Sequence, residues 1–337
     1  MALAHNSWII DVRELPPMEV IFGRSSAMVA ARELLERIAD KTVPVLIQGE
    51  SGTGKDIFAK LLHLSSDRSN SAWVKVSCPA IPHALIESEL FGYEKGAFTG
   101  AYATKRGRVE LANMGTLFLD EVGGLDLSIQ AKLLQLLQDG SFSRVGGSDL
   151  KKVNTRFVCA ANGNLKQQVD EGTFRLDFFF RINAVTIDLP PLRQRTEDIP
   201  QLTDYFLGVH SKVFQIEPKP LSREIVKMML RYPWPGNIRQ LENVIRSYVL
   251  IGDEEAVATE LVPTAPGRVI PEIDLDNPIS LKEITKAATR NLETEIILKV
   301  LRANGWNRRK TAKWLNISYR SLLYKLQETR DNPPREK

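Results

Sequence analysis

A glycine-rich loop constrains the fold of this 337-residue chain more than any other feature. The loop, Gly49-Glu50-Ser51-Gly52-Thr53-Gly54-Lys55, follows an apolar run at 43–47 and precedes a helical pattern at 57–64. GxxxxGK in this strand, loop, helix order is typical of a phosphate-binding loop, where backbone amides and a helix N-terminus surround phosphates. Lys55 is expected to reach the β- and γ-phosphates. The sequence therefore predicts a nucleotide site at the end of a buried strand.

The remaining strand and helix patterns predict the architecture around this loop. Apolar runs at 73–77, 116–119 and 155–160 alternate with helical segments, which indicates an α/β fold with a doubly wound parallel sheet. Strand signals end at Leu189-Pro190-Pro191-Leu192. Amphipathic helices are then expected at three places, namely 199–214, 223–230 and 238–251. They predict a small helical lid on the sheet domain.

We expect five segments along the chain. A proline-rich stretch without helical or strand pattern predicts a flexible linker near the C-terminal end. The expected boundaries are a lead-in at 1–19, an α/β ATPase subdomain at 20–190, a helical lid at 191–252, a linker at 253–280 and a separate all-α domain at 281–330. The lead-in is too short for a sensor domain. Control by a regulatory protein in trans is therefore expected.

Two adjacent carboxylates end the apolar run at 115–119. Asp120 and Glu121 would lie at the carboxyl end of a strand, where ligands bind in parallel sheets. Asp120 is suited to hold magnesium through water, and Glu121 to orient and activate the water that attacks the γ-phosphate. Asp56 stands where the general loop pattern has a Ser or Thr on magnesium, so the metal depends on Asp120, water or Asp56 itself. The alternative is an exposed acidic strand end, which the upstream loop disfavours.

Four further polar residues are candidates for the nucleotide site. Arg175 and Arg181 lie in an aromatic segment, and guanidinium groups stabilise transition-state charge when a neighbouring subunit inserts them. On the residues alone, pairing of an arginine with Asp177 is the favoured alternative. Arg239 begins a lid helix and either touches nucleotide or caps structure. Asn162 follows a predicted strand and is a candidate sensor of the γ-phosphate.

A second loop of small residues lies between the phosphate loop and the acidic pair. It reads Gly96-Ala97-Phe98-Thr99-Gly100-Ala101. Two glycines and two alanines leave the backbone free to bend, and the aromatic side chain offers a concentrated apolar contact. The loop is predicted to be a protein-contacting tip on a nucleotide-driven unit.

The C-terminal segment carries most of the basic charge. The whole chain has a net charge of +4, but residues 281–337 hold 14 basic and 6 acidic residues, and 296–327 holds no acidic residue. This distribution fits binding to a phosphate backbone. A long helix is expected at 281–302, then two short ones at 307–315 and 318–327, as in a helix-turn-helix.

The last helix is expected to enter the major groove of double-stranded DNA. Residues expected to meet bases are Tyr319, Arg320, Ser321 and Tyr324. Residues expected on phosphates are Arg308, Arg309, Lys310 and Lys325. The expected core is Leu315, Ile317, Leu322, Leu323 and Leu326. A basic bundle that does not bind DNA remains the alternative.

Composition excludes several classes of protein. Cys78 and Cys159 have no metal-type spacing and are expected to be buried, reduced thiols. No apolar run approaches the roughly 18 residues of a membrane span, and no secretory signal opens the chain. A hydrophobic content of 43% with 26% charged residues is ordinary for a soluble globular chain. We expect a cytoplasmic protein without a membrane segment.

The order of these motifs resembles the sigma-54-dependent transcriptional activators, or bacterial enhancer-binding proteins, a branch of the AAA+ ATPases. The resemblance extends from about residue 20 to 328, and the C-terminal segment looks like a Fis-type domain. The motifs that carry it are GESGTGKD, ESELFGYEKGAFTGA, GTLFLDEV, LPPLRQRTEDI and PWPGNIRQLENV.

The resemblance implies roles for particular residues. It implies that the loop from Gly96 to Ala101 contacts sigma-54, and that ATP and magnesium are the cofactors. It also implies a homo-oligomeric, hexameric ring. Asn162 would be the first sensor, Arg239 the second sensor, and Arg175 and Arg181 the fingers acting in trans.

Two residues depart from the family pattern. Asp56 stands where the family usually has Glu. Ser77 takes the place of an Asn thought to hold the catalytic glutamate in check. Both departures concern the surroundings of the expected metal and of Glu121.

The leading hypothesis is an ATP-hydrolysing transcription activator that binds upstream DNA and remodels sigma-54 RNA polymerase to open promoters. One alternative is a DNA-binding regulator of other promoters that uses its ATPase module for oligomerisation. Another is a AAA+ remodeller of some other protein. The intact loop at 96–101 argues against the first alternative, and DNA binding by the basic segment would argue against the second.

Overall fold

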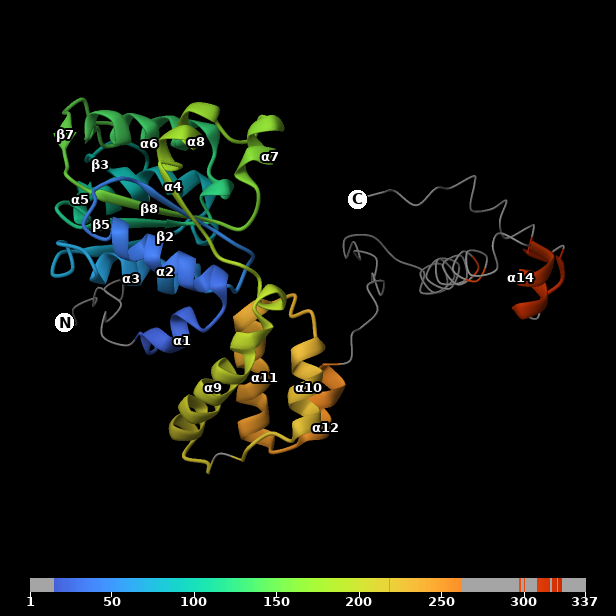
Figure 1. Cartoon of the computed structure of the whole chain (residues 1–337). Helices are drawn as coiled ribbons and strands as arrows, with labels where there is room; N and C mark the ends of the chain where they lie inside the picture. Colours follow the sequence, from blue (N-terminus) through green and yellow to red (C-terminus); the bar gives the residue numbers. More distant parts are fainter. Residues whose placement is uncertain are drawn as a thin grey trace. The chain divides into compact units, whose positions relative to one another are not determined.

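The computed structural model divides the chain into two compact units, Met1–Pro263 and Thr264–Lys337 (Figure 1). The described residues are 15–217, 219–261, 297, 300, 308–315, 317–319, 321 and 322. The lead-in at 1–14, most of the linker and most of the helix expected at 281–302 lie outside the described residues.

A five-stranded parallel sheet forms the centre of the larger unit, with the strand order β2-β5-β8-β1-β9. The strands are β1 (Val45–Gln48), β2 (Trp73–Ser77), β5 (Thr116–Asp120), β8 (Arg156–Ala161) and β9 (Val185–Asp188). Strand β1 pairs with β8 on one side and β9 on the other, so the phosphate loop leaves from the interior of the sheet. The predicted doubly wound parallel sheet is confirmed.

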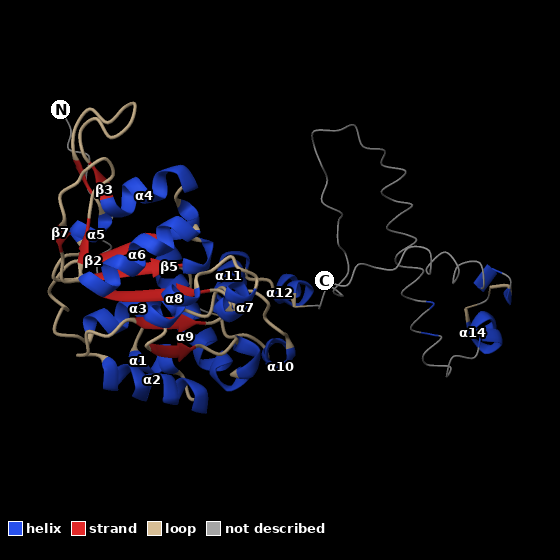
Figure 2. Ribbon diagram, turned by 90° about the horizontal axis from the view of Figure 1, so that it is seen from above, coloured by secondary structure: helices blue, strands red, loops and turns tan. Residues whose placement is uncertain are grey.

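Helices cover both faces of the sheet (Figure 2). The helices of this part are α1 (Met18–Phe22), α2 (Ser26–Ile38), α3 (Lys55–Leu64), α4 (His83–Phe91), α5 (Arg108–Leu111), α6 (Leu127–Asp139), α7 (Leu165–Asp170) and α8 (Leu176–Ile182). Alternate residues of each strand enter opposite cores: Leu117 and Leu119 pack with α4 and α6, whereas Phe118 packs with α2 and α3. Both cysteines are buried, as expected.

Strand β9 and two hairpins were not predicted from the sequence. Strand β9 has four residues, two of them polar, which gives little periodic signal. The hairpins pair β3 (Gly92–Tyr93) with β4 (Lys105–Arg106), and β6 (Ser141–Phe142) with β7 (Lys151–Lys152). Their strands are too short for periodicity to reveal, yet the first hairpin carries the small-residue loop.

The helical lid has its own apolar core. Its helices are α9 (Ile199–Phe214), α10 (Arg223–Arg231), α11 (Asn237–Ile251) and α12 (Glu254–Glu260), of which the first three were predicted. Helix α12 corrects the expected boundary at 252: residues 253–261 were expected as linker, but Val257 and Leu261 pack in the lid core. Trp234 is fully buried among them, and its indole N–H donates to the carbonyl of Met229 at 2.8 Å. Within the described residues, no helix is long and apolar enough to cross a membrane.

The smaller unit is described around α14 (Arg308–Trp314). Ile297, Ala312 and Leu322 form a buried cluster, against which Leu315 and Ile317 pack. The apolar residues predicted for this core are therefore found in it where they are described. Leu323 and Leu326 lie outside the described residues.

The junction between lid and sheet domain depends on one buried carboxylate. Asp198, just before α9, accepts hydrogen bonds from the backbone N–H groups of Arg24 (2.6 Å) and Ser25 (3.2 Å) and from Ser25 Oγ (3.0 Å). These donors belong to the start of α2. The carboxylate thereby fixes the first lid helix to the sheet domain.

Replacing this carboxylate should destabilise the larger unit. Asp198→Ala leaves three donors without a partner, so the free energy of unfolding should fall by about 3 kcal/mol in urea denaturation followed by tryptophan fluorescence. The control is Asp204→Ala, an exposed aspartate on the same helix, which should change stability by less than about 0.5 kcal/mol. Equal stability of the two variants would contradict the structural role of Asp198.

Candidate nucleotide site and protein-contacting loop

The phosphate loop is shaped by glycines and packs against the lid. Gly52 and Gly54 have φ angles of +79° and +98°, and a Cβ on Gly52 would lie 2.4 Å from the carbonyl oxygen of Gly236. Ile238 N–H donates to the carbonyl of Gly52 at 3.0 Å. A side chain at position 52 would therefore separate the loop from the lid.

Lys55 is folded back into the loop. It is 6% exposed, and its Nζ donates to the carbonyls of Gly49 (2.8 Å) and Glu50 (2.9 Å). Burial lowers the pKa of Lys55, while the nearby carboxylates of Asp120 and Glu121 oppose that shift. The ammonium can exchange these carbonyl oxygens for phosphate oxygens without leaving the loop.

A cleft of about 360 Å³ lies beside the phosphate loop, between the sheet domain and the lid. Its apolar walls suit the base and sugar of a nucleotide. Apolar residues that line it are Val20, Ile21, Ile57, Leu202, Phe206 and Ile238. They come from α1, α3, α9 and α11, so no single stretch of sequence could have revealed them.

The lid also holds the phosphate loop through polar side chains. Glu50 accepts from Arg193 Nη1 (2.8 Å) and Nη2 (2.5 Å), and this pairing is the main reason that the pKa of Glu50 falls to about 2. Asn237 Nδ2 donates to the carbonyl of Ser51 at 3.0 Å, and Arg239 Nη1 to Ser51 Oγ at 3.2 Å. Arg239 therefore lies on the loop, as expected of a residue that touches nucleotide. Arg193 and Asn237 were not predicted as site residues, although they lie within the family motifs LPPLRQRTEDI and PWPGNIRQLENV.

Two carboxylates converge at the end of β5. Asp120 ends that strand and Asp56 lies in the first turn of α3. Lys75 Nζ is 3.7 Å from Asp56 Oδ2 and 3.8 Å from Asp120 Oδ2. Burial raises the pKa of Asp120, and the ammonium of Lys75 opposes the rise. The ammonium of Lys75 thus lies within 4 Å of both carboxylates.

These residues fit magnesium as part of a nucleotide complex. Carboxylate oxygens are ligands that Mg²⁺ prefers, and it is usually held by one or two carboxylates together with phosphates and water. Among the described residues, no group of three or more acidic, histidine or cysteine side chains could hold a metal alone. The ammonium of Lys75 between Asp56 and Asp120 shows that this point favours positive charge.

Glu121 is held by the amide of Asn162. Its backbone is left-handed, with φ 58° and ψ 52°, which is uncommon for a residue other than glycine. Asn162 Nδ2, on the loop after β8, donates to Glu121 Oε1. The two residues line a hollow of about 140 Å³ together with Gly123 and Gly124. The structure thus brings the predicted water-activating residue and the predicted sensor into contact.

The two candidate finger arginines lie at the two ends of α8: Arg175 is the residue directly before it, and Arg181 is in its last turn. Arg175 Nε and Nη2 donate to Asp177 at 3.0 and 2.6 Å, so the pairing considered from the sequence is present. Arg181 Nη2 donates to the carbonyl of Leu137 at 2.8 Å. Leu176 and Phe180 beside them are exposed. These described contacts leave both guanidinium groups on the surface of the chain.

The small-residue loop is the tip of the β3–β4 hairpin. Gly96 and Gly100 have φ angles of +86° and +107° and open space around them. Phe98 is 43% exposed and packs edge-on against Tyr93, with ring centroids 4.9 Å apart. Ala101, a predicted contact residue, is only 5% exposed and lies inside the base of the loop.

An exposed aromatic side chain next to this loop was not predicted as a contact residue. Tyr102 is 87% exposed, directly after the buried Ala101. In the sequence, only its position directly after the family motif ESELFGYEKGAFTGA points to a role in this contact. Tyr102 adds aromatic surface to that of Phe98 at the tip.

The base of the loop is fixed by one arginine. Arg144 donates to both carboxylate oxygens of Glu110 at 2.7 Å and to Glu94 Oε1 at 2.9 Å. Thr104 Oγ1 donates to Glu94 Oε2 at 2.7 Å. These bonds raise the pKa of Arg144 and lower the pKa of Glu110 and Glu94. The loop can therefore bend at its glycines while its ends stay fixed.

The candidate DNA residues are only partly described. Arg308 and Lys310 are exposed on α14, and Tyr319 is exposed near the start of the next helical stretch. The N–H of Ser321 donates to Ser318 Oγ at 3.0 Å. Arg320, Tyr324, Lys325 and the side chain of Arg309 lie outside the described residues.

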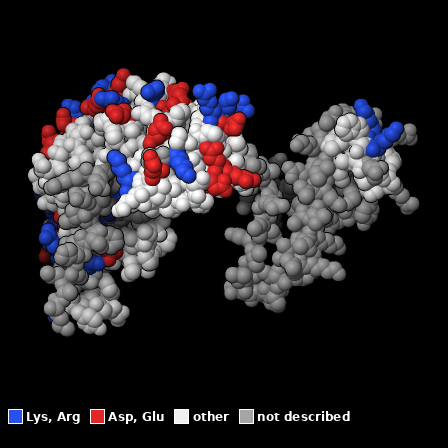
Figure 3. Space-filling view, turned by 90° about the horizontal axis from the view of Figure 1, so that it is seen from below, with Lys and Arg blue, Asp and Glu red and all other residues white. Residues whose placement is uncertain are grey.

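Charge is distributed differently over the two units. Figure 3 shows acidic and basic side chains interspersed on the visible face of the larger unit. The described part of the smaller unit shows only basic charged side chains there. The basic side chains described there, Arg308, Lys310 and Lys313, fit contact with a phosphate backbone.

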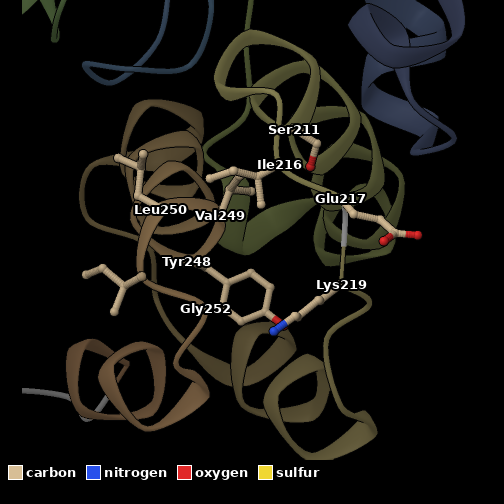
Figure 4. A pocket seen from close by; sticks show the side chains of 9 residues that line it. Ser211, Ile216, Glu217, Lys219, Tyr248, Val249, Leu250 and Gly252 are labelled. Carbon is tan, nitrogen blue, oxygen red and sulfur yellow. The ribbon is translucent and has the colours of Figure 1, made fainter.

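A second hollow, of about 170 Å³, lies within the lid (Figure 4). Ser211, Ile216, Lys219 and Tyr248 are among the residues that line it. It shares no lining residue with the nucleotide cleft. It is therefore separate from the candidate site.

Three protein families match consecutive parts of the chain. The sigma-54 interaction domain matches residues 21–188, and the AAA+ ATPase lid domain matches 193–268. The Fis family of bacterial regulatory proteins matches 288–328. The predicted helix-turn-helix class of the C-terminal segment is thereby confirmed.

Curated relatives match over nearly the whole chain. Regulatory protein AtoC of Escherichia coli is 41% identical over 91% of this chain and 67% of its own length. The Nif-specific regulatory protein of Azotobacter vinelandii is 37% identical over 91% and 58%. The DNA-binding transcriptional regulator NtrC of Klebsiella pneumoniae is 37% identical over 93% and 70%. The chain thus spans roughly two thirds of these relatives.

Solved structures agree with these matches. NtrX from Brucella abortus in complex with ADP superposes with a TM-score of 0.67 at 32% identity, over 91% of this chain and 68% of that one. Hsp104 of Saccharomyces cerevisiae, at 19% identity and a TM-score of 0.51 over 72% and 47%, shares the fold. The chain belongs to the sigma-54-dependent transcriptional activators, AAA+ ATPases with a helical lid and a Fis-family helix-turn-helix domain.

Proposed function

We propose that this chain is an ATP-hydrolysing transcription activator that binds upstream DNA and remodels sigma-54 RNA polymerase to open promoters. The observation that carries the proposal is that one α/β unit holds both a phosphate loop and the small-residue hairpin loop at 96–101. The family matches support both parts. The test is transcription from a sigma-54 promoter with purified components, compared with a promoter for another sigma factor.

Hydrolysis is assigned to the residues at the ends of β1, β5 and β8. Lys55 binds the β- and γ-phosphates, and Glu121 orients and activates the attacking water. Asp120 and Asp56 hold magnesium, which supplies charge neutralisation to the phosphates when bound. Asn162 positions the carboxylate of Glu121, a role that its hydrogen bond supports.

The active form is a homo-oligomeric ring, hexameric as in the family. Arg175 and Arg181 serve as fingers that enter the nucleotide site of the neighbouring subunit. The exposure of both arginines beside Leu176 and Phe180 supports this arrangement, because these apolar side chains gain burial against a neighbour.

The hairpin loop is the contact with sigma-54. Phe98, Thr99 and Tyr102 supply its exposed surface, while Gly96 and Gly100 allow it to rise and fall. Ala101 shapes the loop from inside. A change of nucleotide state shifts the loop between two arrangements.

The remaining segments complete the proposal. The domain boundaries are 20–190 for the ATPase subdomain, 191–261 for the lid, whose core includes Val257 and Leu261, and 281–330 for the DNA-binding domain. Arg308, Lys310 and their basic neighbours bind phosphates of double-stranded DNA. The protein acts in the cytoplasm.

Glu121→Gln should separate nucleotide binding from hydrolysis. The amide cannot activate water, so ATP hydrolysis should fall by about 10²-fold or more, while binding of a fluorescent ATP analogue changes by less than about threefold. Lys55→Ala should weaken the binding itself. Normal hydrolysis by Glu121→Gln would remove this residue from the mechanism.

Phe98→Ala should separate hydrolysis from its output. Transcription from a sigma-54 promoter should be lost, whereas ATP hydrolysis keeps at least about half its rate, because the tip carries contact energy and no chemistry. Leu150→Ala, an exposed leucine outside the loop, is the control and should retain both activities. Equal loss of transcription and hydrolysis in Phe98→Ala would place the loop in the catalytic core instead.

Mixing two inactive variants tests whether the arginine fingers act between subunits. Arg175→Ala and Glu121→Gln should each be inactive alone. In co-assembled rings, an Arg175→Ala subunit can face a Glu121→Gln neighbour that supplies the intact arginine. Random assembly should then restore about one quarter of the wild-type hydrolysis rate per site. A mixture as inactive as its components would show that Arg175 does not complete a neighbour's site.

A further inference from the structure

Lys75 is a cation built into the metal-binding corner of the nucleotide site. Trp73, Lys75 and Ser77 alternate along β2, and Lys75 lies opposite Phe118 of β5 in the register. Its ammonium is 5.6 Å from the centroid of the Phe118 ring, and its side chain is 28% exposed. The stem thus runs along the sheet, on the face that α3 covers.

The ammonium ends between the two carboxylates assigned to magnesium. It is 3.7 Å from Asp56 Oδ2 and 3.8 Å from Asp120 Oδ2. These carboxylates belong to different elements, so the lysine bridges the first turn of α3 and the end of β5. At such distances, one positive charge offsets part of the repulsion between the exposed carboxylate of Asp56 and the partly buried carboxylate of Asp120.

Two properties of the site follow from this placement. Magnesium and the ammonium favour the same oxygen atoms, so each weakens binding of the other. Without metal, the ammonium still offsets one of the two negative charges of Asp56 and Asp120 and so reduces their repulsion of the phosphates of a nucleotide. Both effects arise from the charge of Lys75: it weakens metal binding, and it strengthens nucleotide binding in the absence of metal.

We propose that Lys75 is a resident counter-cation that competes with magnesium for Asp56 and Asp120 and allows nucleotide to bind before the metal arrives. This inference rests on the proposed magnesium site. Lys75 would give up its contacts with Asp56 and Asp120 when magnesium is bound there. Lys75 is therefore a positioning residue that sets the order and the affinity of metal binding.

The test compares wild type with Lys75→Met, which keeps the length of the apolar stem and removes the charge. Binding of a fluorescent ADP analogue in EDTA should become about tenfold weaker, because Asp56 and Asp120 lose one counter-charge and repel phosphate more strongly. Binding of Mn²⁺ to the ADP-loaded protein, followed by loss of the free-ion electron paramagnetic resonance signal with protein in excess over ADP, should become about tenfold tighter.

The opposite signs distinguish this role from a structural one. A variant that merely distorted the site would bind both ADP and Mn²⁺ more weakly, and that result would overturn the inference, as would unchanged values for both. Lys132→Met, which removes an equally simple ion pair with Glu87 on another helix, should leave both affinities unchanged.

A second variant separates this inference from the site on which it rests. Asp120→Asn should remove Mn²⁺ binding to the ADP-loaded protein in wild-type and Lys75→Met backgrounds. If Mn²⁺ binds normally to Asp120→Asn, the proposed magnesium site is wrong. If Mn²⁺ binding is lost in Asp120→Asn but Lys75→Met matches wild type, only the role of Lys75 is wrong.

Discussion

The contact between the phosphate loop and the lid is the constraint on which the site depends. The loop leaves the sheet at β1. Two lid residues hold it: Arg193 pairs with Glu50, and the N–H of Ile238 donates to the carbonyl of Gly52. Because the same contact bounds the apolar cleft, any movement of the lid changes the shape of the nucleotide site. This contact therefore offers a direct route by which bound nucleotide can move the lid as a rigid body.

Charge inside the site is balanced by side chains from several strands. The carboxylates of Asp56, Asp120 and Glu121 lie near the ammonium groups of Lys55 and Lys75. The side-chain amide of Asn162 donates a hydrogen bond to the carboxylate of Glu121. Each group is held by a neighbour that a bound nucleotide or cation could replace. The chain thus presents a preorganised set of charges, which is the arrangement that favours stabilisation of transferred phosphoryl groups.

The hairpin that carries the small-residue loop combines a fixed base with a tip that has open space around its glycines. Arg144 ties Glu94 to Glu110 at the base, whereas Gly96 and Gly100 have no neighbour that a side chain would meet. Strong charge-assisted bonds hold one end and conformational freedom is confined to the other. Motion can therefore be transmitted to the tip without loosening the sheet domain.

Local sequence determined the phosphate loop, four of the five strands, the first three lid helices and the basic C-terminal segment, because each is encoded by spacing within a short window. Tertiary structure alone decided the apolar cleft, the pairing of Glu121 with Asn162, the burial of Ala101 and the place of Lys75. These features join residues that are far apart in the chain or depend on which way a side chain points. Periodicity and motif spacing carry no information about such contacts, since they arise only when strands take their order in the sheet.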